Sequence, residues 1–173
     1  MKRIITMLVL GLGSIGYAGE ATLASALCGE VAYLKKRLEV SRHAPDLLMV
    51  MADLAQKIEI EPRAFAQDSR YQKICGLKHV RSDNFGDFIT YGGTHYDRII
   101  RQYPQSDLVD DAAYELIYVI TDDTYNYSDT RIEKKKLLAF LKRYPKSNKR
   151  KEAQARIREI DTALKNGEPP ILD

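Results

Sequence analysis

A pattern of tyrosine, proline and serine occurs twice in this chain at a fixed offset. The segment "RQYPQSDLVDDAAYEL" begins at Arg101, and "KRYPKSNKRKEAQARI" begins at Lys142. The shared positions are Tyr103, Pro104, Ser106 and Ala112 in the first copy and, 41 residues later, Tyr144, Pro145, Ser147 and Ala153 in the second. A fixed offset of this kind is the signature of a chain built from structural repeats that pack on their neighbours.

Each copy predicts two helices joined by a tight turn. Proline cannot continue a helix, so Pro104 and Pro145 end the first helix of each copy. The serine that follows can cap the amides of a second helix. The second helix carries a small alanine, Ala112 or Ala153, at a position where the paired helix can approach closely. Residues 94–166 are therefore predicted to form two helical hairpins.

Helical periodicity identifies the residues that face the core of these hairpins. A threonine and a glutamate, Thr130 and Glu133, have the spacing of a capping box and predict that the third helix starts there. The residues expected to face inward are Tyr96, Ile99, Ile100, Tyr103, Val109, Ala112, Ala113, Leu116, Ile117 and Ile120 in the first copy and Leu137, Phe140, Leu141, Tyr144, Ala153, Ile157, Ile160 and Leu164 in the second.

The first half of the chain also has helical spacing. Apolar residues recur with helical periodicity within 30–40 and 45–58, and Pro62 predicts the end of one helix and the start of another that extends through Ile74. We expect an N-terminal helical portion over 19–75 and a connector, with room for a short helix, over 76–93. The expected fold is all-α, with stacked antiparallel helical hairpins and a short tail at 167–173.

The first residues have the order of a secretory signal peptide. Lys2 and Arg3 precede an apolar run that ends near Ile15, and small residues follow. Cleavage is expected after Ala18, which makes 1–18 the signal peptide; Ala24-Ser25-Ala26 is the alternative site. A buried N-terminal helix is the competing interpretation, which the glycines of this segment oppose. The apolar run is shorter than the ~20 residues that span a bilayer, so no transmembrane segment is expected after cleavage.

Two cysteines are present, Cys28 and Cys75. An even number of cysteines in an exported protein suggests one disulfide, with two reduced buried cysteines as the alternative. A bacterial lipid-anchor motif requires a small residue before the cysteine, whereas Leu27 precedes Cys28. This argues against a lipid anchor.

The segments "YDRIIRQYPQSDLVDDAAYELI" and "LLAFLKRYPKSNKRKEAQARIREI" resemble the tetratricopeptide-type repeats of bacterial envelope proteins. The similarity is greatest to BamD-like outer-membrane assembly lipoproteins and to YbgF-like periplasmic proteins associated with the Tol-Pal system. It covers about residues 88 to 165. The resemblance implies a right-handed helical solenoid that binds segments of other proteins and has no catalytic residues.

The chain departs from that pattern in two respects. Its offset of 41 exceeds the usual 34 residues because "TDDTYNYSDT" lengthens the joint between hairpins. Two repeats are also fewer than the roughly three that a stable stack needs. We expect the N-terminal helices to supply the missing layer.

Few residues suggest catalysis. His43, His79 and His95 lack the spacing of a metal-binding motif, and neither a phosphate-binding loop nor a nucleophile elbow is present. The alternative to a binding protein is an envelope metal-dependent hydrolase that uses the segment from His79 to Asp97, with Asp83 or Asp87 as further ligands. We expect no enzyme, no cofactor and no metal. Acidic and basic residues are nearly balanced and interspersed, which argues against nucleic acid as a partner.

Tyrosines are the best candidates for a binding surface. Tyr114, Tyr118, Tyr125 and Tyr127 cluster on one helix and the loop after it, and tyrosine is enriched at interfaces. Tyr114 and Tyr118 have packing against the neighbouring hairpin as an alternative role. The chain is expected to be a periplasmic scaffold or adaptor, with secretion as the second choice. Its partner would be another envelope protein or peptide, and the chain itself a monomer or dimer.

Overall fold

The computed structural model describes residues 18–82, 86–119 and 127–167, and within these residues the chain is mostly helical, as expected. The predicted signal peptide, except for Ala18, and most of the tail lie outside the described residues. In the described part of the chain, no helix is long and apolar enough to cross a membrane. The elements are α1 (Ala18–Leu38), α2 (Ala44–Gln56), α3 (Pro62–Gln67), α4 (Arg70–Lys73), β1 (Leu77–Ser82), β2 (Gly86–Tyr91), α5 (Thr94–Gln102), α6 (Val109–Tyr118), α7 (Tyr127–Arg143) and α8 (Arg150–Asn166).

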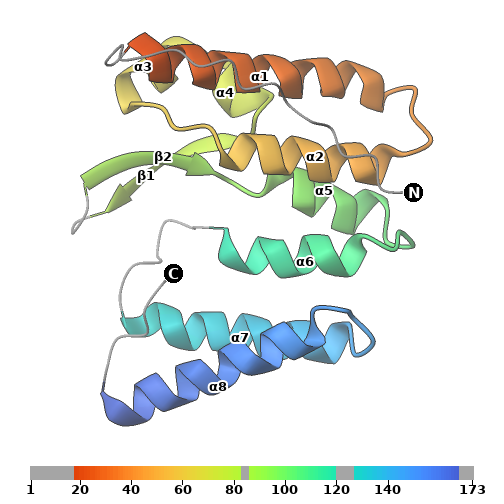
Figure 1. Cartoon of the computed structure of the whole chain (residues 1–173), viewed down its shortest axis with the longest axis vertical. Coiled ribbons are helices and arrows are strands. Elements are labelled where there is room, and N and C mark those ends of the chain that lie inside the picture. Colours follow the sequence, from red (N-terminus) through yellow and green to blue (C-terminus); the bar gives the residue numbers. More distant parts are fainter. Residues whose placement is uncertain (1–17, 83–85, 120–126, 168–173) are drawn as a thin grey trace.

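Three antiparallel helical hairpins lie one on another in chain order (Figure 1). The hairpin α1/α2 packs through α2 on α5, and the hairpin α5/α6 packs through α6 on α7. The N-terminal helices thus form the third layer that two repeats alone lack. The turns that close the three hairpins lie along one edge of the stack, and the β-strands lie along the opposite edge (Figure 1).

The repeated turn has the same backbone hydrogen bonds in both copies. In the first copy, the Ser106 amide donates to the carbonyl of Tyr103 at 2.9 Å, and the Ser106 hydroxyl accepts from the Leu108 amide at 3.2 Å. The equivalent bonds of the second copy are Ser147 to Tyr144 at 3.1 Å and Lys149 to Ser147 at 3.0 Å. Each serine therefore closes the turn that leads into the second helix, but the N-cap residues are Leu108 and Lys149, so the prediction that the serines cap the amides of these helices was wrong.

The buried apolar residues form two cores that meet at α6. The first core is enclosed by α1, α2, α5 and the strands, and it includes Ala112 from α6 and Val119, the residue after α6. The second core lies between α6, α7 and α8. Its buried members are Tyr114, Leu137, Phe140, Ala153 and Ile160. Ala112 and Ala153 are both 0 % exposed, so small residues stand where neighbouring helices pack closely, as predicted.

The predicted connector at 76–93 forms a β-hairpin, so the expectation of a short helix there was wrong. Strands β1 and β2 pair antiparallel from Leu77 with Tyr91 to Ser82 with Gly86. Gly86 has φ = 76°, a left-handed conformation that glycine adopts at little cost and that suits the end of a short hairpin loop. The β-branched and aromatic residues of β2 favour the strand.

Two predicted helix boundaries also differ from the structure. Helix α7 begins at Tyr127, three residues before Thr130, and Glu133 does not complete a capping box. Glu133 instead accepts hydrogen bonds from the guanidinium of Arg156 on α8, the shorter at 2.8 Å. The single helix expected through Ile74 is split into α3 and α4, because Asp68 is extended (φ = −132°, ψ = 101°) and accepts a hydrogen bond from the Arg70 amide.

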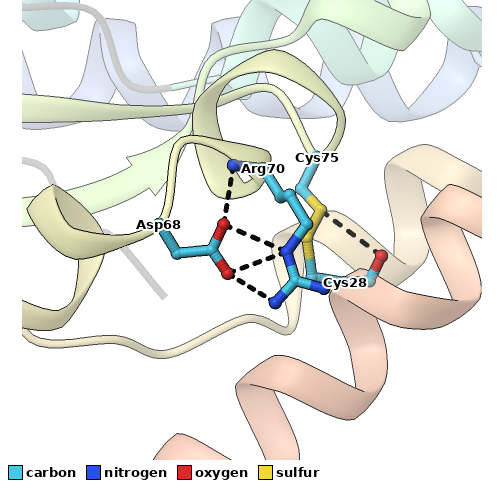
Figure 2. The surroundings of a disulfide bond; sticks show 4 residues. All are labelled: Cys28, Asp68, Arg70 and Cys75. Carbon is cyan, nitrogen blue, oxygen red and sulfur yellow. Dashed lines mark hydrogen bonds and ion pairs between the residues drawn. A yellow bond between two sulfur atoms is a disulfide. The ribbon is translucent and has the colours of Figure 1, made fainter.

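The predicted disulfide is present in the structure. The sulfur atoms of Cys28 and Cys75 lie 2.10 Å apart and join the middle of α1 to the second residue after the end of α4 (Figure 2). Beside this bond, the Arg70 guanidinium is paired with the Asp68 carboxylate at 2.6 Å, and this hydrogen bonding lowers the pKa of Asp68. The disulfide thus closes a loop that contains α2, α3 and α4.

Candidate functional site

Tyr114 and Tyr118 have different environments although they are one helical turn apart on α6. Tyr114 is only 8 % exposed, and its ring centroid lies 5.4 Å from that of Phe140 on α7. The ammonium of Lys149 lies 5.4 Å from the centroid of the same ring. Tyr114 therefore belongs to the second core, in agreement with the packing alternative, and cannot present its ring to a partner.

Tyr118 remains accessible at 42 % exposure. Its hydroxyl donates to the Tyr114 hydroxyl at 3.1 Å, and the two rings pack edge to face with centroids 5.2 Å apart. Burial of its hydroxyl end, followed by this hydrogen bond, raises the pKa of Tyr118. Of the other candidates, Tyr125 lies outside the described residues. Tyr127 opens α7, but its side chain is not among those described.

A groove of about 550 Å³ lies beside Tyr118. One wall is the segment 56–64, which runs from the end of α2 into α3; the other wall is β2, and Tyr118 and Val119 close one side. The groove arises because α2 and α6 end at the edge of the stack where the β-hairpin lies. Lys57 terminates α2, Pro62 starts α3, and the residues between them are not helical. Helix α6 ends at Tyr118 on the same edge (Figure 1).

The groove is acidic at its polar positions. Among the described residues, its charged lining residues are Glu59, Glu61 and Asp87, with no lysine or arginine. Asp87 is paired with His79 at 3.2 Å and with Arg81 at 3.5 Å. Within the described residues, neither Glu59 nor Glu61 forms an ion pair. The groove therefore carries uncompensated negative charge next to apolar side chains such as Ile60 and Ile89.

Sequence reasoning missed this groove, although one of its walls has a local signal. The stretch Ile58-Glu59-Ile60-Glu61 alternates apolar and acidic residues and ends at a proline, which is typical of an extended segment. The other wall could be found only through the β-hairpin. No sequence pattern places the end of α6 between these two segments.

The residues of the alternative metal site lie in separate environments. His79 is paired with Asp87 on the β-hairpin, and Asp97 is paired with Arg101 at 2.8 Å along α5. Asp83 lies outside the described residues. Among the side chains that the structure describes, no group of three or more His, Cys, Asp or Glu could hold a metal ion.

His95 is buried in the first core and has a structural partner. Its backbone amide donates to the Tyr91 hydroxyl at 2.8 Å, and its Nδ1 lies 3.0 Å from the same oxygen. The Tyr91 proton can therefore be donated to Nδ1, which requires a neutral imidazole. Burial lowers the pKa of His95 to about 4, with smaller contributions from the positive charges of Arg98 and Lys35 and an opposing backbone hydrogen bond to Ile74. His95 thus stabilises the join between β2 and α5.

No family model, curated protein or solved structure matches this chain. The assignment of a function therefore depends on the chain's own residues. An accessible tyrosine, apolar side chains, uncompensated carboxylates and a strand edge meet in one groove. These groups can bind a peptide segment.

Proposed function

We propose that the chain is an exported helical-repeat adaptor of the periplasm that binds another envelope protein or a peptide segment of one, without catalysis. The groove beside Tyr118 carries this proposal. Its walls come from the segment after α2, from β2 and from the end of α6, so a ligand there would contact the first two helical hairpins and the β-hairpin at once. Repeat proteins commonly bind partners on surfaces that several repeats build together.

The identical turns support the assignment of residues 94–166 to the tetratricopeptide type. Ser106 and Ser147 make equivalent hydrogen bonds at the offset of 41 residues. Each turn is followed by a helix with a fully buried alanine, Ala112 or Ala153. A third hairpin, α1/α2, extends the stack to the number of layers that such repeats need.

Two features support export. The cationic and apolar residues 2–15 have the order of a signal peptide, and disulfides persist mainly in oxidising compartments. Expression in a bacterium with periplasmic fractionation tests this part. We expect the protein in the periplasmic fraction, with Gly19 as its first residue in N-terminal sequencing. Protein that retains Met1 in the cytosolic fraction would contradict export.

Site-specific photocrosslinking in cells tests the binding function. A photoreactive phenylalanine analogue at Tyr118 lies in the groove wall, whereas the same analogue at Lys151 lies on an exposed position of α8 outside the groove. We expect a discrete protein adduct from position 118 that position 151 does not give. The absence of any adduct from 118, or the same adducts from both positions, would count against an adaptor that uses this groove.

A further inference from the structure

The outer edge of β2 has unpaired backbone groups. In an antiparallel pair, residues alternate between pairs that exchange hydrogen bonds and pairs whose backbone groups point away from each other. The Gly92 amide donates to the Gly76 carbonyl at 2.8 Å, which makes Gly92 and Gly76 a hydrogen-bonded pair. Every second pair in the register is of the same type, so Lys78 with Thr90 and Val80 with Phe88 are hydrogen-bonded pairs too. The amides and carbonyls of Asp87, Ile89 and Tyr91 therefore point to the outer edge.

This edge borders the groove. Residues 87–91 all line it. Because consecutive residues of a strand point to opposite faces, the groove lies alongside β2 and not over one of its faces. Within the described part of the chain, no backbone hydrogen bond joins Asp87, Ile89 or Tyr91 to another element. The opposite wall is the non-helical segment from Ile58 to Glu61. The groove thus has the form of a slot between a strand edge and a second extended segment.

We propose that this slot accepts an extended, basic peptide segment of a partner protein, which pairs with β2 as a third strand. The inference rests on the proposed adaptor function and specifies the partner's chemistry. Strand addition uses backbone hydrogen bonds for affinity and side-chain contacts for specificity. An edge strand with unpaired amides and carbonyls is a template for such pairing.

Charge decides which peptide fits. Glu59 and Glu61 carry carboxylates without an ion-pair partner on the wall opposite β2, and the slot lining that the structure describes has no basic side chain. A bound segment with lysine or arginine at alternate positions would meet these carboxylates. The residues between them would contact apolar groups such as Ile60 and Ile89, because successive side chains of a strand point to opposite sides.

Selection from a random peptide library displayed on phage, on the mature disulfide-bonded protein, tests this proposal. We expect enriched peptides in which basic and apolar residues alternate. The best synthetic peptide should slow amide exchange at Asp87 and Ile89, and N-methylation of its alternate backbone amides should abolish binding. Enrichment of acidic or helical peptides, or of none, would overturn the proposal.

A pair of matched variants tests the role of charge. Glu59→Gln with Glu61→Gln should weaken the selected peptide's binding about tenfold at low salt, since two exposed ion pairs are lost. The control is Glu30→Gln with Glu39→Gln, which removes the same charge from exposed positions on and just after α1 and should leave affinity unchanged. Equal effects of both pairs, or none, would refute charge recognition in the slot.

The two proposals can fail separately. A crosslink from Tyr118 without peptide binding at β2 would retain the adaptor and reject strand addition. Self-association of the protein that protects the β2 amides without any peptide would also reject it, because the edge would then be occupied by a second copy.

Discussion

Burial keeps His95 uncharged, and this predicts a dependence of stability on pH. Its pKa is about 4 in the folded protein, below the ordinary 6.5, so the unfolded chain binds a proton more readily between these values. Stability is therefore lost as pH falls from about 6.5 toward 4. Because of this group, the free energy of unfolding should be ~2 kcal/mol lower at about pH 4.5 than at about pH 7.5.

Urea denaturation at both pH values measures this effect. The variant His95→Gln cannot titrate, so its free energy of unfolding should change less with pH than that of the wild-type protein. Carboxylates elsewhere titrate in both proteins, and the difference between the two slopes isolates His95. Equal slopes would show that His95 is not kept neutral by the fold.

Tyr144 offers a second test at the level of one atom. Its hydroxyl is buried and has no hydrogen-bond partner among the described residues, while its ring packs 5.4 Å from that of Phe140. Tyr144→Phe removes an unsatisfied polar group and retains the ring. We expect an unfolding free energy that is unchanged or higher by up to ~1 kcal/mol. Tyr114→Phe should be destabilising in the same assay, because Tyr114 accepts the hydrogen bond of Tyr118.

Among the elements, the repeated turn is the one most open to test. Ser106 and Ser147 make the same turn hydrogen bond in sequences that otherwise differ. Ser106→Ala and Ser147→Ala should each lower the free energy of unfolding by ~1 kcal/mol, because each change removes one intramolecular hydrogen bond. Thermal or urea melts would measure both variants. A large effect from one serine and none from the other would show that the two turns are not energetically equivalent.

The helical hairpins were predictable because their signals are local. Pro104 and Pro145 stop helices in any context, and the apolar stripes beside them need only a periodicity of 3.6 residues. The β-hairpin was missed because its glycines were interpreted only as interruptions of helical periodicity. Gly86 in its left-handed conformation and the run from Phe88 to Tyr91 are the hairpin signal.

Long-range contacts explain the remaining misses. Glu133 has the spacing of a capping residue, but Arg156 on the partner helix is a stronger partner for its carboxylate. The groove combines residues near 60, 88 and 118. Local patterns predicted Tyr118 as a candidate without its neighbours, since only the packing of α2, the β-hairpin and α6 brings them together.

Across the whole molecule, stability is divided between two cores of unequal size. The first core holds the disulfide and residues from α1, α2, α5 and the β-hairpin, whereas the second has five buried members among the described residues. In repeat proteins, stability is roughly a sum over neighbouring layers. The hairpin α7/α8 forms the end of the stack and packs mainly on α6, so we expect its amides to exchange by local opening at lower free energy than those of the first core.

The disulfide allows this division to be tested directly. Cys28 and Cys75 are separated by 47 residues, all within the part of the chain that forms the first core. In the loop-entropy description, a loop of this length stabilises the folded chain by about 4 kcal/mol. Cys28→Ala with Cys75→Ala should therefore accelerate exchange strongly in α1, α2 and β1. Exchange in α7 and α8 should change little, because these helices already open without unfolding the first core.

Hydrogen exchange with mass spectrometry resolves the two regions in one sample. A uniform acceleration along the chain would instead mean that the three layers unfold as one cooperative unit, with α6 transmitting the loss from one core to the other.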